Sequence, residues 1–201
     1  MKGIKLIIYC AVGFFLFTGC QSNKTDKVEV NIKDNEELKE IADTYTYEDY
    51  KKVFEKAVSE ASDFEADKGL NKWLIRILAQ EKLSYETELT DEQVIQLAEG
   101  AMEEDKVWKS IARDDYGVTV TEAEVDKYIK EGPDTLDLPQ MKAYADALGL
   151  SIKELNHNFD RDIYEKNAIW LKLKPELEKK YDITDNNEQV EKYEEEVENQ
   201  L

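Results

Sequence analysis

Cysteine and histidine are almost absent from this chain, which has two cysteines and one histidine among its 201 residues. Cys10 and Cys20 both lie in the first twenty residues, so the rest of the chain has no cysteine for a disulfide. His157 has no second histidine or cysteine with which to share an ordinary zinc site, and a surface or packing role is favoured for it. The sequence contains neither a glycine-rich phosphate loop nor a nucleophile elbow. We therefore expect no metal, no other cofactor and no enzymatic activity.

Basic residues are scarce relative to acidic ones. The chain has 27 Lys and Arg against 46 Asp and Glu, which gives a formal net charge of −19 at pH 7. A protein that binds nucleic acid needs a concentrated basic surface, because it must neutralise backbone phosphates. We therefore do not expect nucleic acid as a partner. The same charge opposes adsorption to anionic lipid.

Long hydrophobic runs are also rare, and the one continuous run covers residues 6–17. A transmembrane helix needs about 20 consecutive apolar residues, so this run is too short to cross a bilayer. Lys2 and Lys5 precede it, and basic residues before a short apolar run are typical of a secretory signal peptide. We predict that residues 1–19 are a signal peptide.

The sequence Phe17-Thr18-Gly19-Cys20 resembles the lipobox of bacterial lipoproteins, although leucine is usual where Phe17 stands. The resemblance implies cleavage between Gly19 and Cys20 and a diacylglycerol on the Cys20 sulfur. Two or more acyl chains give stable anchoring, because each buried methylene contributes about 0.8 kcal/mol. The expected location is the extracytoplasmic face of the cell membrane. The alternative is an ordinary secretory signal with an incidental cysteine.

Behind the lipid site, residues 20–34 are polar and lack a sustained apolar period, which predicts a flexible tether. Residues 35–183 are long enough for one hydrophobic core, and we expect a single helical domain. The segment 184–201 is strongly acidic, with a thin apolar stripe of Val190, Tyr193, Val197 and Leu201. Two alternatives remain for this tail: a marginal helix docked on the body, or a solvated extension.

Apolar residues recur every three or four positions from residue 47 onward, and alternation of period two is almost absent. With only three prolines in the chain, this pattern predicts an all-α fold with two long amphipathic helices and short connecting ones. The predicted helices cover 47–64 (Tyr50, Val53, Phe54, Ala57, Val58 and Ala61), 70–83 (Trp73, Leu74, Ile77 and Leu78) and a long segment from Thr90 (Val94, Leu97, Ala98, Ala101, Met102, Trp108, Ile111 and Ala112).

Capping boxes and turn residues mark the ends of further helices. A serine or threonine followed three residues later by Glu or Gln satisfies two free backbone donors at a helix start. These pairs are Thr90 with Gln93, Thr121 with Glu124, and Ser151 with Glu154. Gly117, Gly132-Pro133 and Gly149 are predicted ends, and Pro139 is a predicted start.

The stripe that follows Ser151 predicts a second long helix, reaching about Leu177. Its apolar residues are Ile152, Leu155, Phe159, Ile163, Trp170 and Leu173. Pro175 should break or bend this helix, because proline lacks the amide donor and crowds the preceding turn.

The order of these elements resembles the amino-terminal helical domain of the SurA and PrsA class of extracytoplasmic chaperones, which the peptide-binding domain of trigger factor also resembles. The likeness lies in YGVTVTEAEVDKYI at 116–129, a short helix over 141–148 and GLSIKEL at 149–155, and it is clearest over 75–181. It implies a helical cradle that holds unfolded exported polypeptides without nucleotide. The likeness to PrsA favours a Gram-positive source.

This chain differs from that class in one respect, which concerns prolyl-isomerase activity. SurA and PrsA carry parvulin prolyl-isomerase domains after this unit, but too little chain follows Tyr181 for another such domain. His157 also lacks the second histidine that is typical of a parvulin site. We therefore do not transfer isomerase activity to this chain.

Four aromatic residues are candidates for contact with a client: Trp108, Tyr144, Phe159 and Trp170. Each could instead fill the core, which is the favoured interpretation for all four and most of all for Trp108, because apolar residues surround it on its stripe. A client surface needs an exposed apolar patch larger than monomers usually carry. The pattern alone leaves both interpretations open.

Two function classes follow from the sequence. The leading one is a lipid-anchored, non-enzymatic chaperone-like or peptide-binding module whose partners are the membrane, through lipid on Cys20, and exported polypeptides. The alternative is an envelope scaffold or regulatory lipoprotein that binds one specific folded partner.

Replacing Cys20 with alanine should abolish lipid labelling and release the protein from the membrane fraction, because the thioether has no other attachment site. The helical body should stay folded, since Cys20 lies outside every predicted apolar stripe. Metabolic labelling with a radioactive fatty acid, followed by membrane fractionation, checks this. Unchanged labelling of the Cys20→Ala protein contradicts the lipoprotein prediction.

Overall fold

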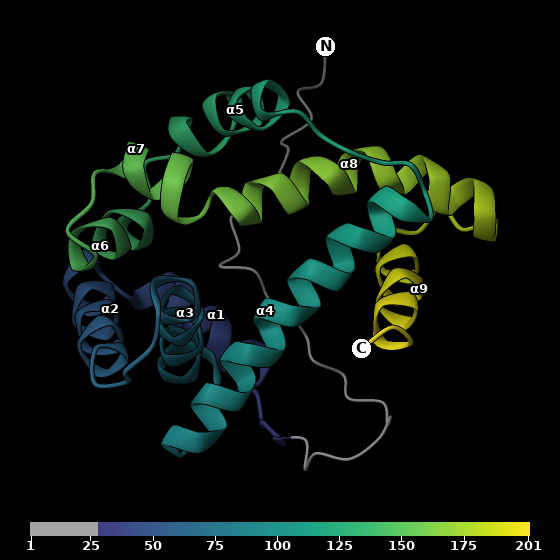
Figure 1. The fold of residues 1–201 in the computed structure, drawn as a ribbon. Coiled ribbons are helices and arrows are strands. Elements are labelled where there is room, and N and C mark those ends of the chain that lie inside the picture. The colour runs from purple at the N-terminus through teal and green to yellow at the C-terminus, as the bar shows by residue number, and fades with distance from the viewer. Residues whose placement is uncertain (1–27) are drawn as a thin grey trace.

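The computed structural model describes residues 28–201, and these residues form nine α-helices and no β-strand (Figure 1). The predicted all-α class is confirmed. The helices are α1 (Asn35–Thr44), α2 (Tyr47–Ala61), α3 (Lys68–Ser84), α4 (Asp91–Asp114), α5 (Glu122–Glu131), α6 (Pro139–Ala147), α7 (Ile152–Glu154), α8 (Arg161–Tyr181) and α9 (Asn186–Glu198), with a 3-10 turn at Pro133–Thr135 and a π-helical turn at Leu155–Phe159.

The first hydrophobic core lies between α2, α3, α6 and the first half of α4. Phe54 and Leu74 are almost fully buried at its centre, and the centre of the Tyr144 ring lies 4.6 Å from the centre of the Phe54 ring. The stripes predicted for 47–64 and 70–83 supply most of this core, while Val53 and Val58 at the edge are half-buried. Burial of these apolar side chains is the main force that holds α2, α3 and the first half of α4 against α6.

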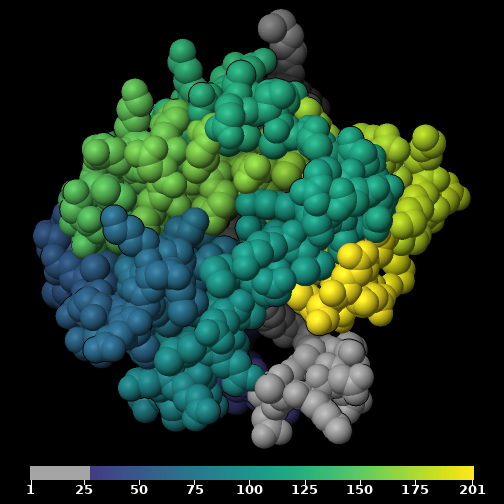
Figure 2. Space-filling view, viewed as in Figure 1, coloured from purple at the N-terminus to yellow at the C-terminus, as the bar shows by residue number. Residues whose placement is uncertain are grey.

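A second core joins the far half of α4 to α8 and α9. Trp108 and Leu173 are buried in it together with Tyr193 of the acidic tail, which is 1% exposed. The Tyr193 hydroxyl donates a hydrogen bond of 2.7 Å to the carbonyl oxygen of Trp108. Figure 2 shows the C-terminal segment, in yellow, against the teal surface of α4. Of the two alternatives for the tail, the structure shows a docked helix.

Helix ends follow the predicted local signals closely. Thr90, Thr121 and Ser151 each form a complete capping box with the residue three positions on. Gly117 and Gly149 have φ of +65° and +68°, the left-handed conformation that a side chain makes unfavourable. The predicted boundaries at these positions are confirmed.

The prediction of one continuous helix from Ser151 is wrong. The capped turn α7 widens into the π-helical turn, and α8 begins only at Arg161. Tertiary hydrogen bonds explain the interruption: the buried Asn156 amide donates to Asp134 at 2.9 Å and accepts from the Tyr164 hydroxyl at 3.1 Å. Such polar contacts between distant segments are not encoded in helical periodicity.

Pro175 does not end α8, which continues to Tyr181. The missing amide of Pro175 leaves the carbonyl of Leu171 without its helical donor. Leu171 is 60% exposed, so water can reach this side of the helix. Of the predicted break or bend at Pro175, the break does not occur, and both Leu171 and Pro175 lie on an exposed face of the helix, where water can replace the missing donor.

A cluster of charges joins α3 to the start of α8. Arg76 donates to Asp160 at 2.9 Å and binds both carboxylate oxygens of Asp162, at 2.8 and 2.9 Å. Lys72 reaches Asp162 at 2.7 Å, and the guanidinium carbon of Arg76 lies 4.9 Å from the centre of the Trp73 ring. The side chains of Arg76 and Asp160 are each only 11% exposed.

The two carboxylates of this cluster respond differently to burial. Burial would raise the pKa of Asp162, but hydrogen bonds and charge from Arg76 and Lys72 outweigh it and hold that pKa well below the usual range. Burial raises the pKa of Asp160 in spite of Arg76. A carboxyl pKa that is lower in the folded state stabilises the fold above about pH 4 and loses that contribution as the pH falls. The contribution of Asp162 is therefore present at neutral pH.

The described part of the chain begins in an extended segment that pairs with the loop between α3 and α4. Ile32 forms an isolated antiparallel bridge with Tyr85, and the Glu86 amide donates to the Asn31 carbonyl at 2.8 Å. The end of the predicted tether is thus held against the body. The predicted signal peptide, Gly19 and Cys20 lie outside the described residues. No helix among residues 28–201 has both the length and the apolar character to span a membrane.

Replacing Trp108 with alanine should lower the free energy of unfolding by about 3 to 5 kcal/mol, because it removes buried surface and leaves a cavity beside Tyr193. Urea unfolding followed by circular dichroism measures this. Leu171→Ala is the control and should change stability by less than about 0.5 kcal/mol, since Leu171 is exposed. A Trp108→Ala protein of unchanged stability that binds unfolded protein poorly would place Trp108 on a client surface instead.

Candidate functional site

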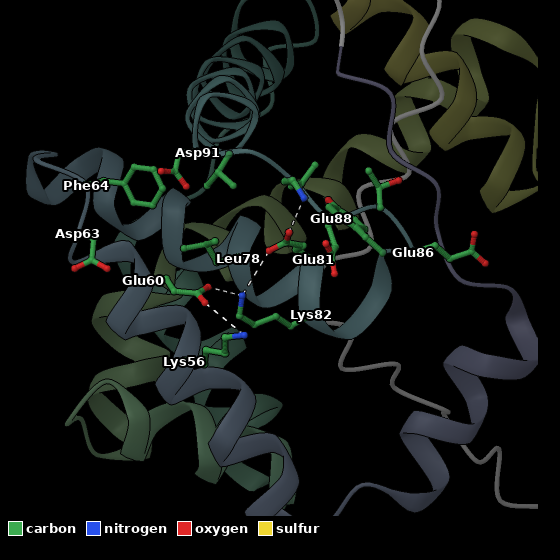
Figure 3. A pocket seen from close by; sticks show the side chains of 14 residues that line it. Lys56, Glu60, Asp63, Phe64, Leu78, Glu81, Lys82, Glu86, Glu88 and Asp91 are labelled. Atoms are coloured by element: carbon green, nitrogen blue, oxygen red, sulfur yellow. Dashed lines mark hydrogen bonds and ion pairs between the residues drawn. The ribbon is translucent and has the colours of Figure 1, made fainter.

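A pocket of about 610 Å³ opens between the end of α2, the second half of α3, the α3–α4 loop and the first turn of α4 (Figure 3). Its volume falls within the range of about 300 to 1,000 Å³ that is usual for ligand sites. Its lining residues are Lys56, Glu60, Asp63, Phe64, Leu78, Glu81, Lys82, Tyr85, Glu86, Thr87, Glu88, Leu89, Asp91 and Val94.

The α3–α4 loop forms one wall of the pocket and is fixed at several points. The Leu89 amide donates a hydrogen bond of 2.7 Å to a carboxylate oxygen of Glu81 on α3. On the other side, the loop bonds to the extended N-terminal segment: the Asn31 amide donates to the Thr87 hydroxyl at 2.9 Å. The wall is therefore largely formed before any ligand binds, which lowers the entropy cost of binding.

Lys82 sits at the base of the pocket between two carboxylates, as Figure 3 shows. Its amine pairs with Glu60 and lies 3.5 Å from Glu81. The Lys82 side chain is 15% exposed, so these carboxylates compensate a largely buried positive charge. Lys56 lies 3.6 Å from Glu60 at the outer edge.

Four further carboxylates at the pocket carry no such compensation. The side chains of Asp63, Glu86, Glu88 and Asp91 are exposed and form no hydrogen bond or ion pair with any described residue. With Glu60 and Glu81 they make six carboxylates against two ammonium groups. These four exposed carboxylates form the rim of the pocket. The rim therefore has excess negative charge that is available to a ligand.

Apolar side chains form the remaining lining. Leu78 and Val94 belong to the first core and are 4% and 2% exposed. Phe64 and Leu89 are half-buried, pack against that core and present their outer surfaces to the pocket. At the same wall, burial and then the charge of Glu81 raise the pKa of Tyr85 to about 12, so its hydroxyl stays protonated at neutral pH. The site combines hydrophobic contact with negative charge.

The four aromatic candidates from the sequence lie away from this pocket. Trp108 and Tyr144 are buried, at 6% and 9% exposure, and Phe159 and Trp170 are half-buried. Tyr144 and Phe159 are neighbours, with ring centres 5.8 Å apart, and Trp108 and Trp170 lie 6.5 Å apart in the second core. The favoured core positions of Trp108 and Tyr144 are confirmed, while client contact by the half-buried Phe159 and Trp170 stays a prediction.

The pocket residues come from segments of no distinctive pattern, so the sequence did not predict them. One signal was present: the stretch 86–92 places Leu89 among Glu86, Glu88, Asp91 and Glu92 between two helices. Acidic residues are too frequent in this chain for that stretch to stand out. Within residues 28–201, no group of three or more His, Cys, Asp or Glu side chains is arranged to hold a metal ion.

Replacing Glu81 with alanine should accelerate hydrogen exchange of the Leu89 amide by about tenfold. The amide loses its acceptor, and a net hydrogen-bond contribution near 1.4 kcal/mol corresponds to that factor. Glu81→Gln is the matched control, because its amide oxygen can still accept from Leu89. NMR or mass spectrometry measures the exchange rate of the Leu89 amide in both variants. Equal protection in the two would show that the loop is held by other contacts.

The chain matches no protein-family model, no curated protein and no solved structure.

Proposed function

We propose that this protein is a lipid-anchored, extracytoplasmic polypeptide-binding protein of the chaperone type, which holds exported chains without catalysing a reaction. The observation that carries the proposal is the open pocket beside the α3–α4 loop, with its half-buried Phe64 and Leu89 and its uncompensated carboxylates. Extended polypeptide offers what such a site can bind: single apolar side chains between polar groups. The likeness of the element order to the SurA and PrsA class supports the same function.

The position of the pocket relative to the predicted lipid site agrees with this function. The wall of the pocket pairs with Asn31, and the chain from Cys20 to Asn31 reaches at most about 40 Å when fully extended. A lipid on Cys20 would therefore keep the pocket within that distance of the membrane surface. Polypeptides that emerge from the membrane would meet it before they fold.

The experiment uses residues 21–201, since both hydrophobic cores lie within that part of the chain. At equimolar ratio this protein should slow the aggregation of at least three unrelated, chemically unfolded exported proteins, as followed by light scattering. A matched amount of serum albumin controls for crowding.

The scaffold alternative makes the opposite prediction for this experiment. A dedicated scaffold should leave the aggregation of all three unfolded proteins unchanged and bind one folded envelope protein. Failure to slow any of them would overturn the proposed function.

A further inference from the structure

The charges around the pocket indicate which polypeptides it binds, and this inference rests on the proposed function. We propose that the pocket selects segments in which an apolar residue is flanked by lysine or arginine. The apolar residue contacts Phe64 and Leu89, and the flanking cations pair with the carboxylates of the rim.

The charged side chains at the pocket fall into two groups, those that are compensated by an opposite charge and those that are not. Lys82 is already matched by Glu60 and Glu81, so it offers little to an incoming anion. The carboxylates of Asp63, Glu86, Glu88 and Asp91 have no partner among the described residues. These carboxylates repel an acidic ligand, because its charge has the same sign. They attract a basic ligand, whose charge is complementary.

An apolar surface lies between those charges. Phe64 follows α2 and Leu89 belongs to the α3–α4 loop, so the two side chains approach the pocket from different segments. Both also pack against the first core, which limits their motion. A peptide side chain placed between them buries apolar surface at about 25 cal/mol per Å². Charge alone would attract any cation, but this contact requires an apolar group as well.

The carboxylates come from both sides of the apolar surface: Asp63 from the segment after α2, and Glu86 and Glu88 from the α3–α4 loop. Figure 3 shows Asp63 on one side of the pocket and Glu86 on the other, with Leu78 and Glu81 between them. A segment with cations on both sides of one apolar residue therefore matches the arrangement.

The test uses fluorescein-labelled synthetic peptides of twelve residues and the protein from residue 21 to 201. One peptide alternates lysine with leucine, a second replaces every lysine with glutamate, and a third replaces every leucine with serine. Fluorescence anisotropy should give at least tenfold tighter binding of the lysine–leucine peptide than of the other two. Its affinity should fall between 50 and 500 mM salt, because exposed charges are screened.

Two triple variants separate local from overall charge. In the rim variant, Asp63→Asn, Glu86→Gln and Glu88→Gln together remove three of the four uncompensated carboxylates. In the control variant, Glu178→Gln, Asp182→Asn and Glu191→Gln make the same change at exposed positions elsewhere. The rim variant should bind the lysine–leucine peptide about tenfold more weakly, while the control variant should bind it as the unchanged protein does. Equal loss in both variants, or equal binding of all three peptides, overturns the inference.

The aggregation assay distinguishes this inference from the function on which it rests. If the rim variant slows aggregation as well as the unchanged protein does and no peptide preference is seen, the proposed function stands and the charge selectivity is wrong. If the unchanged protein slows no aggregation but discriminates between the peptides in the predicted way, the selectivity stands and the chaperone function is wrong. Circular dichroism of each variant checks that it remains folded.

Discussion

The arrangement of the two hydrophobic cores depends on the interaction of Arg76 with Asp160 and Asp162. This guanidinium lies on α3, beside Trp73 of the first core, and its carboxylate partners lie at the start of α8, which leads to the second core. A buried guanidinium without a partner would be strongly unfavourable, so the folded state requires both segments to meet at this point. The π-helical turn before Asp160 provides the change of direction that the meeting needs.

Helix α4 supplies the second link between the cores, since Val94 and Ala98 lie in one and Trp108 and Ile111 in the other. The pocket lies at its first turn, next to the loop that the N-terminal segment and Glu81 hold in place. The wall is therefore attached to a rigid helix and to the segment nearest the predicted lipid site. A site built in this way needs little reorganisation to bind an extended chain.

The acidic C-terminal helix illustrates how packing can overcome unfavourable charge. Burial raises the pKa of Glu104 on α4 and of Glu194 on α9, which shows that these carboxylates lose hydration where the helices meet. Tyr193 offsets this cost: it buries its ring against Trp108, with centres 4.9 Å apart, and its hydroxyl finds an acceptor. Tyr193, with the buried Val197 and Gln189, thus docks a helix that composition alone would leave in solvent.

The sequence by itself determined the all-α class, the apolar faces of α2, α3 and α4, and the capped starts at Thr90, Thr121 and Ser151. These features depend on residues within a few positions of each other, and the helical repeat makes them readable. Only the tertiary structure decided that the helix after Ser151 is interrupted, that α9 docks and that Phe64 and Leu89 share a pocket with unpaired carboxylates. Each of these depends on contacts between segments far apart in the chain, such as Asn156 with Asp134 or Tyr193 with Trp108, for which local periodicity holds no information.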